Sequence, residues 1–218
     1  MAVGNQTPVD TATDFAVQRF VVQQMISKLS TMTLARVIDC TNDGGVIPVG
    51  TLTVQLMVNM VSGDAQAFEH APIYKVPYLR LQGGSNAVII DPEPGDIGLV
   101  GFCERDISAV KKSRAVSNPG SARQYSKSDG VWVATVWAAN APTQYVVMNS
   151  EGITLVSPNG ITLQAPTIIL DGAVQATSTI DAADNISAPD VISGTISGAT
   201  HTHGGVTVGG AATLGPNP

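Results

Sequence analysis

The sequence is short of cationic and aromatic side chains, and the shortage falls on its second half. Every Lys and Arg lies at or before Lys127, and every aromatic residue lies at or before Tyr145. Eleven Lys and Arg stand against seventeen Asp and Glu, which gives a net charge of -6. Because nucleic-acid binding needs an excess of cations to neutralise phosphates, this balance argues against a nucleic-acid partner.

Cysteines and long apolar runs are also scarce. Cys40 and Cys103 are too few for a disulfide framework and have no close zinc spacing, so we expect buried free thiols. Residues 1–6 lack the basic start and apolar stretch of a signal peptide, and no run approaches the roughly 18 apolar residues of a membrane helix. We therefore expect a chain that folds in the cytoplasm where it is made. Its 44% of hydrophobic residues is enough to bury a core.

The chain divides into two parts of different composition. Up to Lys127 the acids and bases cancel, and the acids beyond it carry the whole net charge. The 73 residues after Tyr145 contain no aromatic residue and would make a poor independent globule. This part is either a disordered tail or an extended β-structure that shares its core among several chains.

A short repeat favours the β-structure. Gly-Ile-Thr-Leu occurs at residues 152–155 and again at 160–163, and Thr-Ile-Ile-Leu follows at 167–170. Apolar and polar residues alternate in the first two units, and turn formers separate the units. Short strands of one chain would leave their edges exposed, and winding several chains together closes them. We therefore expect an oligomer, most simply a homotrimer.

The first part of the chain predicts one helix and then a small β-barrel. Apolar residues recur at helical spacing from Pro8 to about Leu29, which indicates one amphipathic helix. Strand patterns then occupy residues 33–40, 50–60, 73–81, 87–90, 97–103 and 131–137. With turns between the strands, an OB-fold is a good candidate, although oligonucleotide binding does not follow from that fold.

Several polar clusters resemble sites but are better interpreted as ordinary structure. Residues 83–86 and 91–96 lack the context of a phosphate loop and the spacing of a calcium loop, so we expect turns. His70 has no second ligand nearby in sequence and is expected at the surface. The basic stretch at residues 111–127 is interpreted as a solvated linker, with a docking surface for an acidic partner as the alternative.

His201 and His203 are the strongest candidate metal ligands. In a strand, residues two apart point to the same side, so both imidazoles can face one point. Three chains around an axis would supply six imidazoles, which suits an octahedral metal such as iron, whereas tetrahedral zinc would leave ligands unused. An isolated His-x-His pair often binds no metal, so the motif alone leaves both outcomes open.

Short motifs distributed over the whole chain carry a resemblance to known proteins. They are Thr-Asn-Asp-Gly-Gly at 41–45, Val-Pro-Tyr at 76–78, Arg-Leu-Gln-Gly-Gly-Ser-Asn-Ala at 80–87, Asp-Pro at 91–92, Gly-Asp-Ile-Gly at 95–98, Phe-Cys-Glu-Arg-Asp-Ile-Ser at 102–108, Asn-Pro-Gly-Ser at 118–121 and Thr-His-Thr-His-Gly-Gly at 200–205. In these motifs the chain resembles the central spike or baseplate assembly protein V family of contractile-tailed bacteriophages.

The resemblance implies a mainly β protein in four parts. These are an N-terminal helical segment (1–30), an OB-fold domain attached to the tail hub (31–145), an intertwined trimeric β-helix shaft (146–199) and a metal-bound apex (200–218). It also implies one iron ion per trimer, held by His201 and His203 of all three chains. The protein would then sit in the virion at the baseplate tip, contact the tail hub and pierce the host outer membrane when the sheath contracts, without catalysis.

Two other classes of function agree less well with the sequence. A receptor-binding tail fibre or adhesin that recognises a cell-surface glycan would usually present exposed aromatic platforms, and none follows Tyr145. A wall hydrolase would need a pocket with paired carboxylates, and the acids after Lys127 are scattered through a repeat too thin to enclose one.

Overall fold

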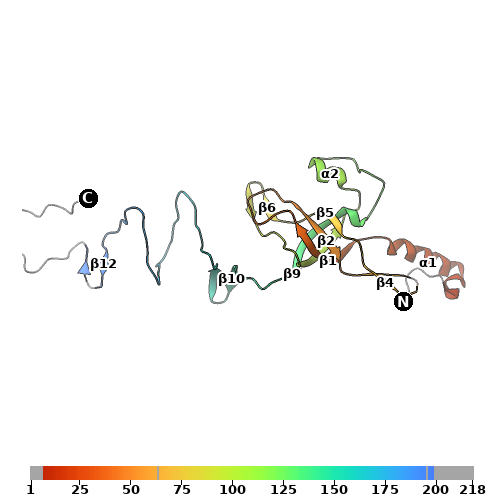
Figure 1. Cartoon of the computed structure of the whole chain (residues 1–218), viewed down its shortest axis with the longest axis horizontal. Helices are drawn as coiled ribbons and strands as arrows, with labels where there is room; N and C mark the ends of the chain where they lie inside the picture. The colour runs from red at the N-terminus through yellow and green to blue at the C-terminus, as the bar shows by residue number, and fades with distance from the viewer. Residues whose placement is uncertain (1–6, 63, 195, 199–218) are drawn as a thin grey trace, which may run out of the picture. The chain divides into compact units, whose positions relative to one another are not determined.

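The computed structural model describes residues 7–62, 64–194 and 196–198. The chain divides into two units, with the division between Asn159 and Gly160. Strands predominate and helices are few, which confirms the mainly β prediction (Figure 1). The helices are η1 (Pro8–Thr11), α1 (Asp14–Ser27), α2 (Ser108–Ser113) and η2 (Lys127–Asp129). No helix among the described residues is long and apolar enough to cross a bilayer.

The N-terminal helical region is interrupted, so the prediction of one continuous helix was wrong. The 3-10 helix η1 ends at Thr11, and α1 begins after Thr13, whose backbone is extended. The Thr13 hydroxyl accepts a hydrogen bond from the Ala16 amide at 3.2 Å, so Thr13 caps the new helix. The apolar series that predicted the helix begins only at Phe15, after this break, so it gave no support for a continuous helix from Pro8.

Five strands form the central sheet, in the order β5-β2-β1-β8-β9 with every neighbouring pair antiparallel. Their bounds are β1 (Met32–Cys40), β2 (Thr51–Leu56), β5 (Ile73–Pro77), β8 (Ile97–Phe102) and β9 (Gly130–Trp137). A parallel bridge between Tyr78 and Trp132 joins the end of β5 to β9. The Leu79 amide also donates to the Trp132 carbonyl at 2.9 Å. The two outer strands therefore meet, and the sheet curls into a barrel.

The core fills the inside of this barrel. Residues alternate between buried and half-buried along β2 and β8, as expected for strands with one face inward. The buried apolar residues are Ala35, Val37, Leu52, Val54, Leu56, Val76, Tyr78, Val100, Phe102 and Trp132. Trp132 is 1% exposed and packs over Gly98, where an added Cβ would lie 2.4 Å from the indole ring and 2.2 Å from the Ala134 carbonyl oxygen. The barrel thus has room for its largest side chain because residue 98 has none.

Short antiparallel hairpins extend from the barrel. β3 (Met60–Val61) pairs with β4 (Ala67–Phe68), and β6 (Leu81–Gly83) pairs with β7 (Asn86–Val88). Further along the chain, β10 (Tyr145–Asn149) pairs with β11 (Gly152–Val156), and β12 (Ile192–Ser193) pairs with β13 (Ile196–Ser197). The repeat units at residues 160–163 and 167–170, which were predicted as strands, are not strands within the described chain. A strand needs a neighbour to accept its hydrogen bonds, and these units have none among the described residues.

Candidate functional site

Residues 145–198, which we call the C-terminal segment, expose nearly all of their apolar side chains. The exposed large apolar residues are Tyr145, Val146, Val147, Met148, Ile153, Leu155, Ile161, Leu163, Ile168, Ile169, Leu170, Val174, Ile180, Ile186, Val191 and Ile192. Monomeric soluble proteins rarely leave so many large apolar side chains uncovered. This surface is therefore a candidate interface with other chains.

The β10–β11 hairpin shows the apolar face most clearly. Val146 lies opposite Leu155, and Met148 lies opposite Ile153, so all four side chains share one face of the two-stranded ribbon. Met148 and Ile153 are 73% and 69% exposed. An isolated two-stranded hairpin is marginally stable in water, so this face needs a covering layer.

Glycines mark the corners of the C-terminal segment. Gly152, Gly160 and Gly172 have φ angles of 129°, 121° and 136°, which other residues rarely adopt. An added Cβ at any of the three would meet nothing within 4 Å. Backbone conformation, rather than lack of space, therefore favours glycine at these corners, and the repeat in the sequence is a repeat of backbone turns.

The two predicted metal ligands, His201 and His203, lie outside the described residues. Among residues 7–62, 64–194 and 196–198, no group of three or more His, Cys, Asp or Glu side chains could hold a metal ion. The metal site at the apex therefore stays a prediction from the sequence.

A buried ionic cluster fixes the 104–129 loop, the long connection between β8 and β9. The Arg123 guanidinium donates to both carboxylates of the cluster, reaching Asp129 at 2.6 and 2.9 Å and Asp106 at 2.6 Å. The Ile107 amide donates to Asp129 at 3.0 Å, and the Ser121 hydroxyl donates to Asp106 at 2.7 Å. Asp129 is fully buried and Asp106 is 5% exposed. The cluster thus ties the beginning of this loop to its end.

The carboxyl groups of this cluster are held in their charged form. Hydrogen bonds from Ser108 are the main cause that lowers the pKa of Asp106 to about 2, and Ser121 and Arg123 add to the effect. Hydrogen bonding from Arg123 lowers the pKa of Asp129 despite its burial. Both carboxyl groups are therefore ionised at neutral pH, and their bonds to Arg123 hold the loop in place.

The sequence did not reveal this cluster, because the stretch at 111–127 was interpreted as a solvated linker. That interpretation was wrong for Arg123, which is half-buried, and incomplete for Lys111, whose Nζ donates to the carbonyls of Lys75 at 3.4 Å and Ser128 at 3.3 Å. Lys112 and Arg114 are exposed. The sequence did contain a signal for the cluster. Asp106 precedes the basic stretch, and Asp129 follows it, directly before β9.

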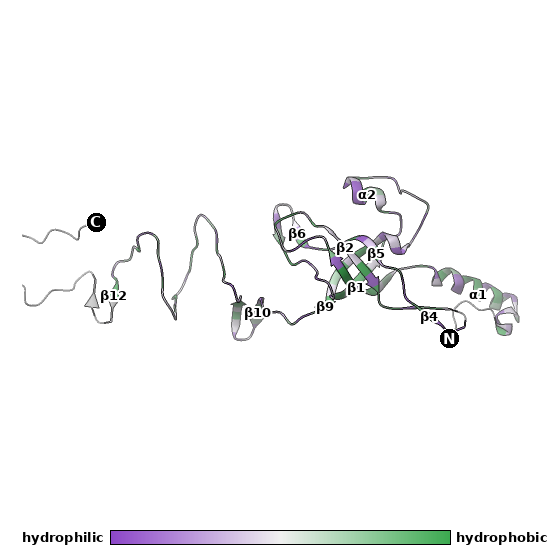
Figure 2. Ribbon diagram, viewed as in Figure 1, coloured by the Kyte–Doolittle hydropathy of each residue, from purple (hydrophilic) through white to green (hydrophobic). Residues whose placement is uncertain are grey.

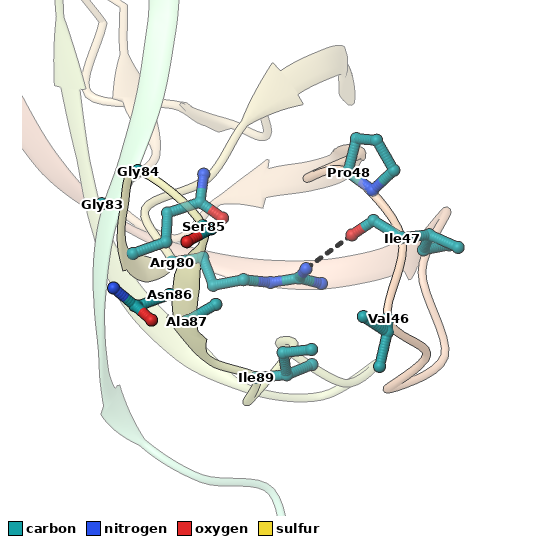
Figure 3. A pocket seen from close by; sticks show the side chains of 11 residues that line it. Val46, Ile47, Pro48, Arg80, Gly83, Gly84, Ser85, Asn86, Ala87 and Ile89 are labelled. Atoms are coloured by element: carbon teal, nitrogen blue, oxygen red, sulfur yellow. Dashed lines mark hydrogen bonds between the residues drawn. The ribbon is translucent and has the colours of Figure 1, made fainter.

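A second cluster fixes the connection between β1 and β2. The Arg80 guanidinium pairs with Asp91 and donates to the Ile47 carbonyl at 2.7 Å, as Figure 3 shows for the latter bond. The Tyr78 hydroxyl donates to Asp91 at 2.6 Å, and the Gly44 amide donates to it at 3.1 Å. Burial and the bond to Asp91 raise the pKa of Tyr78 to about 12.

A shallow pocket lies beside this second cluster. It has a volume of about 370 Å³, and the 46–48 loop, Arg80 and the β6–β7 hairpin line it (Figure 3). The Arg80 donors within it are already taken by Asp91, Tyr78 and Ile47. The 83–86 and 91–96 segments lie in turns or in extended connections beside them. Neither cluster brings together a nucleophile, a base and a place for a substrate.

The remaining residues singled out from the sequence occupy half-buried positions. Cys40 and Cys103 are free and half-buried, not fully buried as predicted, and burial raises the pKa of each thiol. His70 is half-buried rather than at the surface, with its Nδ1 3.1 Å from the Lys127 Nζ. Burial and the nearby cation lower the pKa of His70.

Comparison with known protein families identifies a phage domain. Residues 48–135 match the family described as phage protein Gp138 N-terminal domain. The match runs from just before β2 into β9 and includes the side chains of both ionic clusters. None of the curated proteins matches the chain. The matched stretch is less than half of the sequence, and it supports a phage structural protein of the tail or baseplate type.

Proposed function

We propose that this protein is the homotrimeric central spike at the tip of a contractile phage tail baseplate. In this role it pierces the host outer membrane when the sheath contracts, and it acts mechanically without catalysis. The match of residues 48–135 to a phage protein domain supports a virion protein. The family that the sequence motifs resemble supports the more specific assignment to the spike.

The observation that carries the proposal is the apolar surface of the C-terminal segment. Its side chains alternate, its corners are glycines with positive φ, and its apolar faces have no cover among the residues that the structure describes. Three copies wound together would bury these faces and pair every strand edge. We therefore assign residues 146–199 to an intertwined β-helix shaft.

A shaft of this kind suits membrane penetration. Backbone groups that enter lipid must be hydrogen-bonded internally, and a closed trimeric β-helix satisfies that requirement. Small side chains keep the rod thin, and the absence of aromatic residues after Tyr145 serves that purpose. Opening one strand would require the other two chains to separate as well, so local unfolding under load is disfavoured.

The barrel is proposed as the domain that attaches the shaft to the tail hub, spanning residues 31–145. Its strand order and the parallel bridge between Tyr78 and Trp132 support an OB-fold. The two ionic clusters would keep its long connections fixed while force passes from the hub to the shaft. The exposed cations Lys112 and Arg114 are available for contact with a hub protein.

The apex, residues 200–218, is proposed to hold one iron ion with His201 and His203 of all three chains. Six imidazoles suit an octahedral ion, and such a ligand set would cross-link the ends of the three chains. No step of the proposed mechanism passes through the metal. Its role is to fix the register of the strands at the tip.

The test measures chain number and metal content on one sample of the full chain. Light scattering should give three times 22.4 kDa, and elemental analysis should give one iron per three chains. The double variant His201→Ala, His203→Ala should lose the iron and keep the trimer. A monomer would overturn the spike, a trimer without iron would overturn the apex alone, and saturable binding of purified lipopolysaccharide glycan would favour an adhesin.

A further inference from the structure

Helix α1 buries none of its side chains against the part of the chain that the structure describes. None of its residues is buried, and Phe15, Met25 and Ile26 are 74%, 64% and 60% exposed. Figure 2 shows the apolar stretches along it. A helix of 14 residues is marginal in water when it stands alone. A surface so apolar on a short helix indicates that another chain covers it.

The spacing of the apolar residues along α1 indicates which kind of partner helix could pack against it. Phe15, Val22 and Leu29 recur every seven residues, and Met25 lies between the last two at the matching position of the heptad. Leu29 follows the C-cap and continues the turn, since its amide donates to the Ile26 carbonyl at 3.0 Å. Within α1, Phe15 and Val22 therefore occupy a positions and Gln18 and Met25 occupy d positions, and Leu29 follows just beyond the end of the helix. This spacing is typical of the seam of a coiled coil.

The charges beside the seam fit a second copy of the same helix. In this register Asp14 lies at a g position and Arg19 at the following e position, and parallel neighbouring helices bring g of one to e of the other. The next such pair is Val21 with Ile26, which is apolar on both sides. Arg19 is available for this contact, because its side chain is 52% exposed and its ion pair with Asp10 is loose, at 3.8 Å.

We propose that α1 of three copies associates in parallel as a short coiled coil, which gives the trimer a second interface at its N-terminal end. This inference rests on the homotrimer of the proposed function. Two heptads are too few to associate stably by themselves. Tethering to a common trimer raises the effective concentration of the helices to about the millimolar range, and under that condition a short seam can close.

The experiment compares two cysteine variants of the full chain. Val22→Cys places a thiol in the seam, and Gln23→Cys places one on the next residue, which lies away from it. Under mild oxidation Val22→Cys should give interchain disulfide dimers at least about tenfold more than Gln23→Cys, since seam residues face one another across the bundle. The native Cys40 and Cys103 are present in both variants and in the wild-type control.

Light scattering on the same samples separates the two hypotheses. A trimer in which the two variants cross-link equally overturns the helix bundle and leaves the spike standing, whereas a monomer overturns both. If Val22→Cys fails to fold, hydrogen exchange of the wild-type trimer decides. Amides of α1 should exchange at least about tenfold more slowly than in an unstructured chain. Protection that arises only when a tail hub protein is added would assign α1 to the hub and overturn the proposal.

Discussion

The barrel and the C-terminal segment bury their apolar residues in different ways. The barrel encloses ten apolar side chains, with Trp132 at 1% exposure in the centre. The C-terminal segment, with a similar supply of Val, Ile and Leu, leaves Ile153 69% exposed and Ile169 83% exposed. The two regions differ in the size of their side chains and in the way their strands are connected. Small side chains on short strands of one chain cannot surround a core. The barrel has a buried core within one chain, whereas the proposed shaft would require several chains to form one.

The largest expected effect comes from placing a charge in the proposed shared core. Ile153→Asp would bury a carboxylate in each of three chains, which costs several kcal/mol per chain. We expect the molar mass by light scattering to fall from three chains to one, while the thermal unfolding of the barrel is unchanged. Thr154→Asp, on the opposite face of β11, should keep three chains. Equal loss of the trimer in both variants would contradict the proposed burial of Ile153.

The next largest effect is expected from overpacking the core of the barrel. Gly98→Ala would place a Cβ against the Ala134 carbonyl and the Trp132 ring, so we expect destabilisation of about 3 kcal/mol or more. Gly101→Ala on the same strand meets no atom closer than 3.6 Å and should change stability by less than about 1 kcal/mol. Urea unfolding followed by tryptophan fluorescence measures both variants. Similar midpoints for the two would show that the packing at residue 98 is not tight.

A smaller effect is expected from the ionic cluster. Arg123→Ala leaves two buried carboxylates unpaired, and because the Arg123 side chain is 37% exposed we expect about 2 kcal/mol rather than the full cost of a buried pair. Arg105→Ala removes an exposed pair with Glu104 and should cost less than about 1 kcal/mol. Proteolysis within residues 107–122 should accelerate in the first variant alone. An intact loop in Arg123→Ala would show that other contacts hold it.

The smallest effect is the dependence of barrel stability on acid. The folded pKa of Asp106, about 2, lies below its unfolded value of about 3.9. Its contribution is therefore fully present above pH 4 and is lost as the pH falls towards 2. Urea midpoints measured across this window should decline less in Asp106→Asn than in the wild type. Parallel declines would mean that other carboxyl groups dominate.

Local patterns in the sequence predicted the strands but not the contacts between distant residues. The expected strand at 97–103 is β8, Ile97–Phe102, because alternation and flanking turns are local features. The break at Thr13 was missed because the helix was extended back to Pro8, although the apolar series begins only at Phe15. The ionic cluster was missed because Arg123 and Asp106 are 17 residues apart in the sequence and are brought together only by tertiary structure. The turns at Gly160 and Gly172 were correctly predicted from residue type alone.

The ionic cluster fastens the 104–129 loop near its two ends, away from Val116. Arg123 holds the two ends through Asp106 and Asp129, while Val116, between them, is fully exposed. The cost of lengthening a surface connection grows only slowly with added residues. An epitope or a fluorescent label inserted at Val116 would therefore leave the barrel as it is, and would provide a handle for following this protein in an assembled particle.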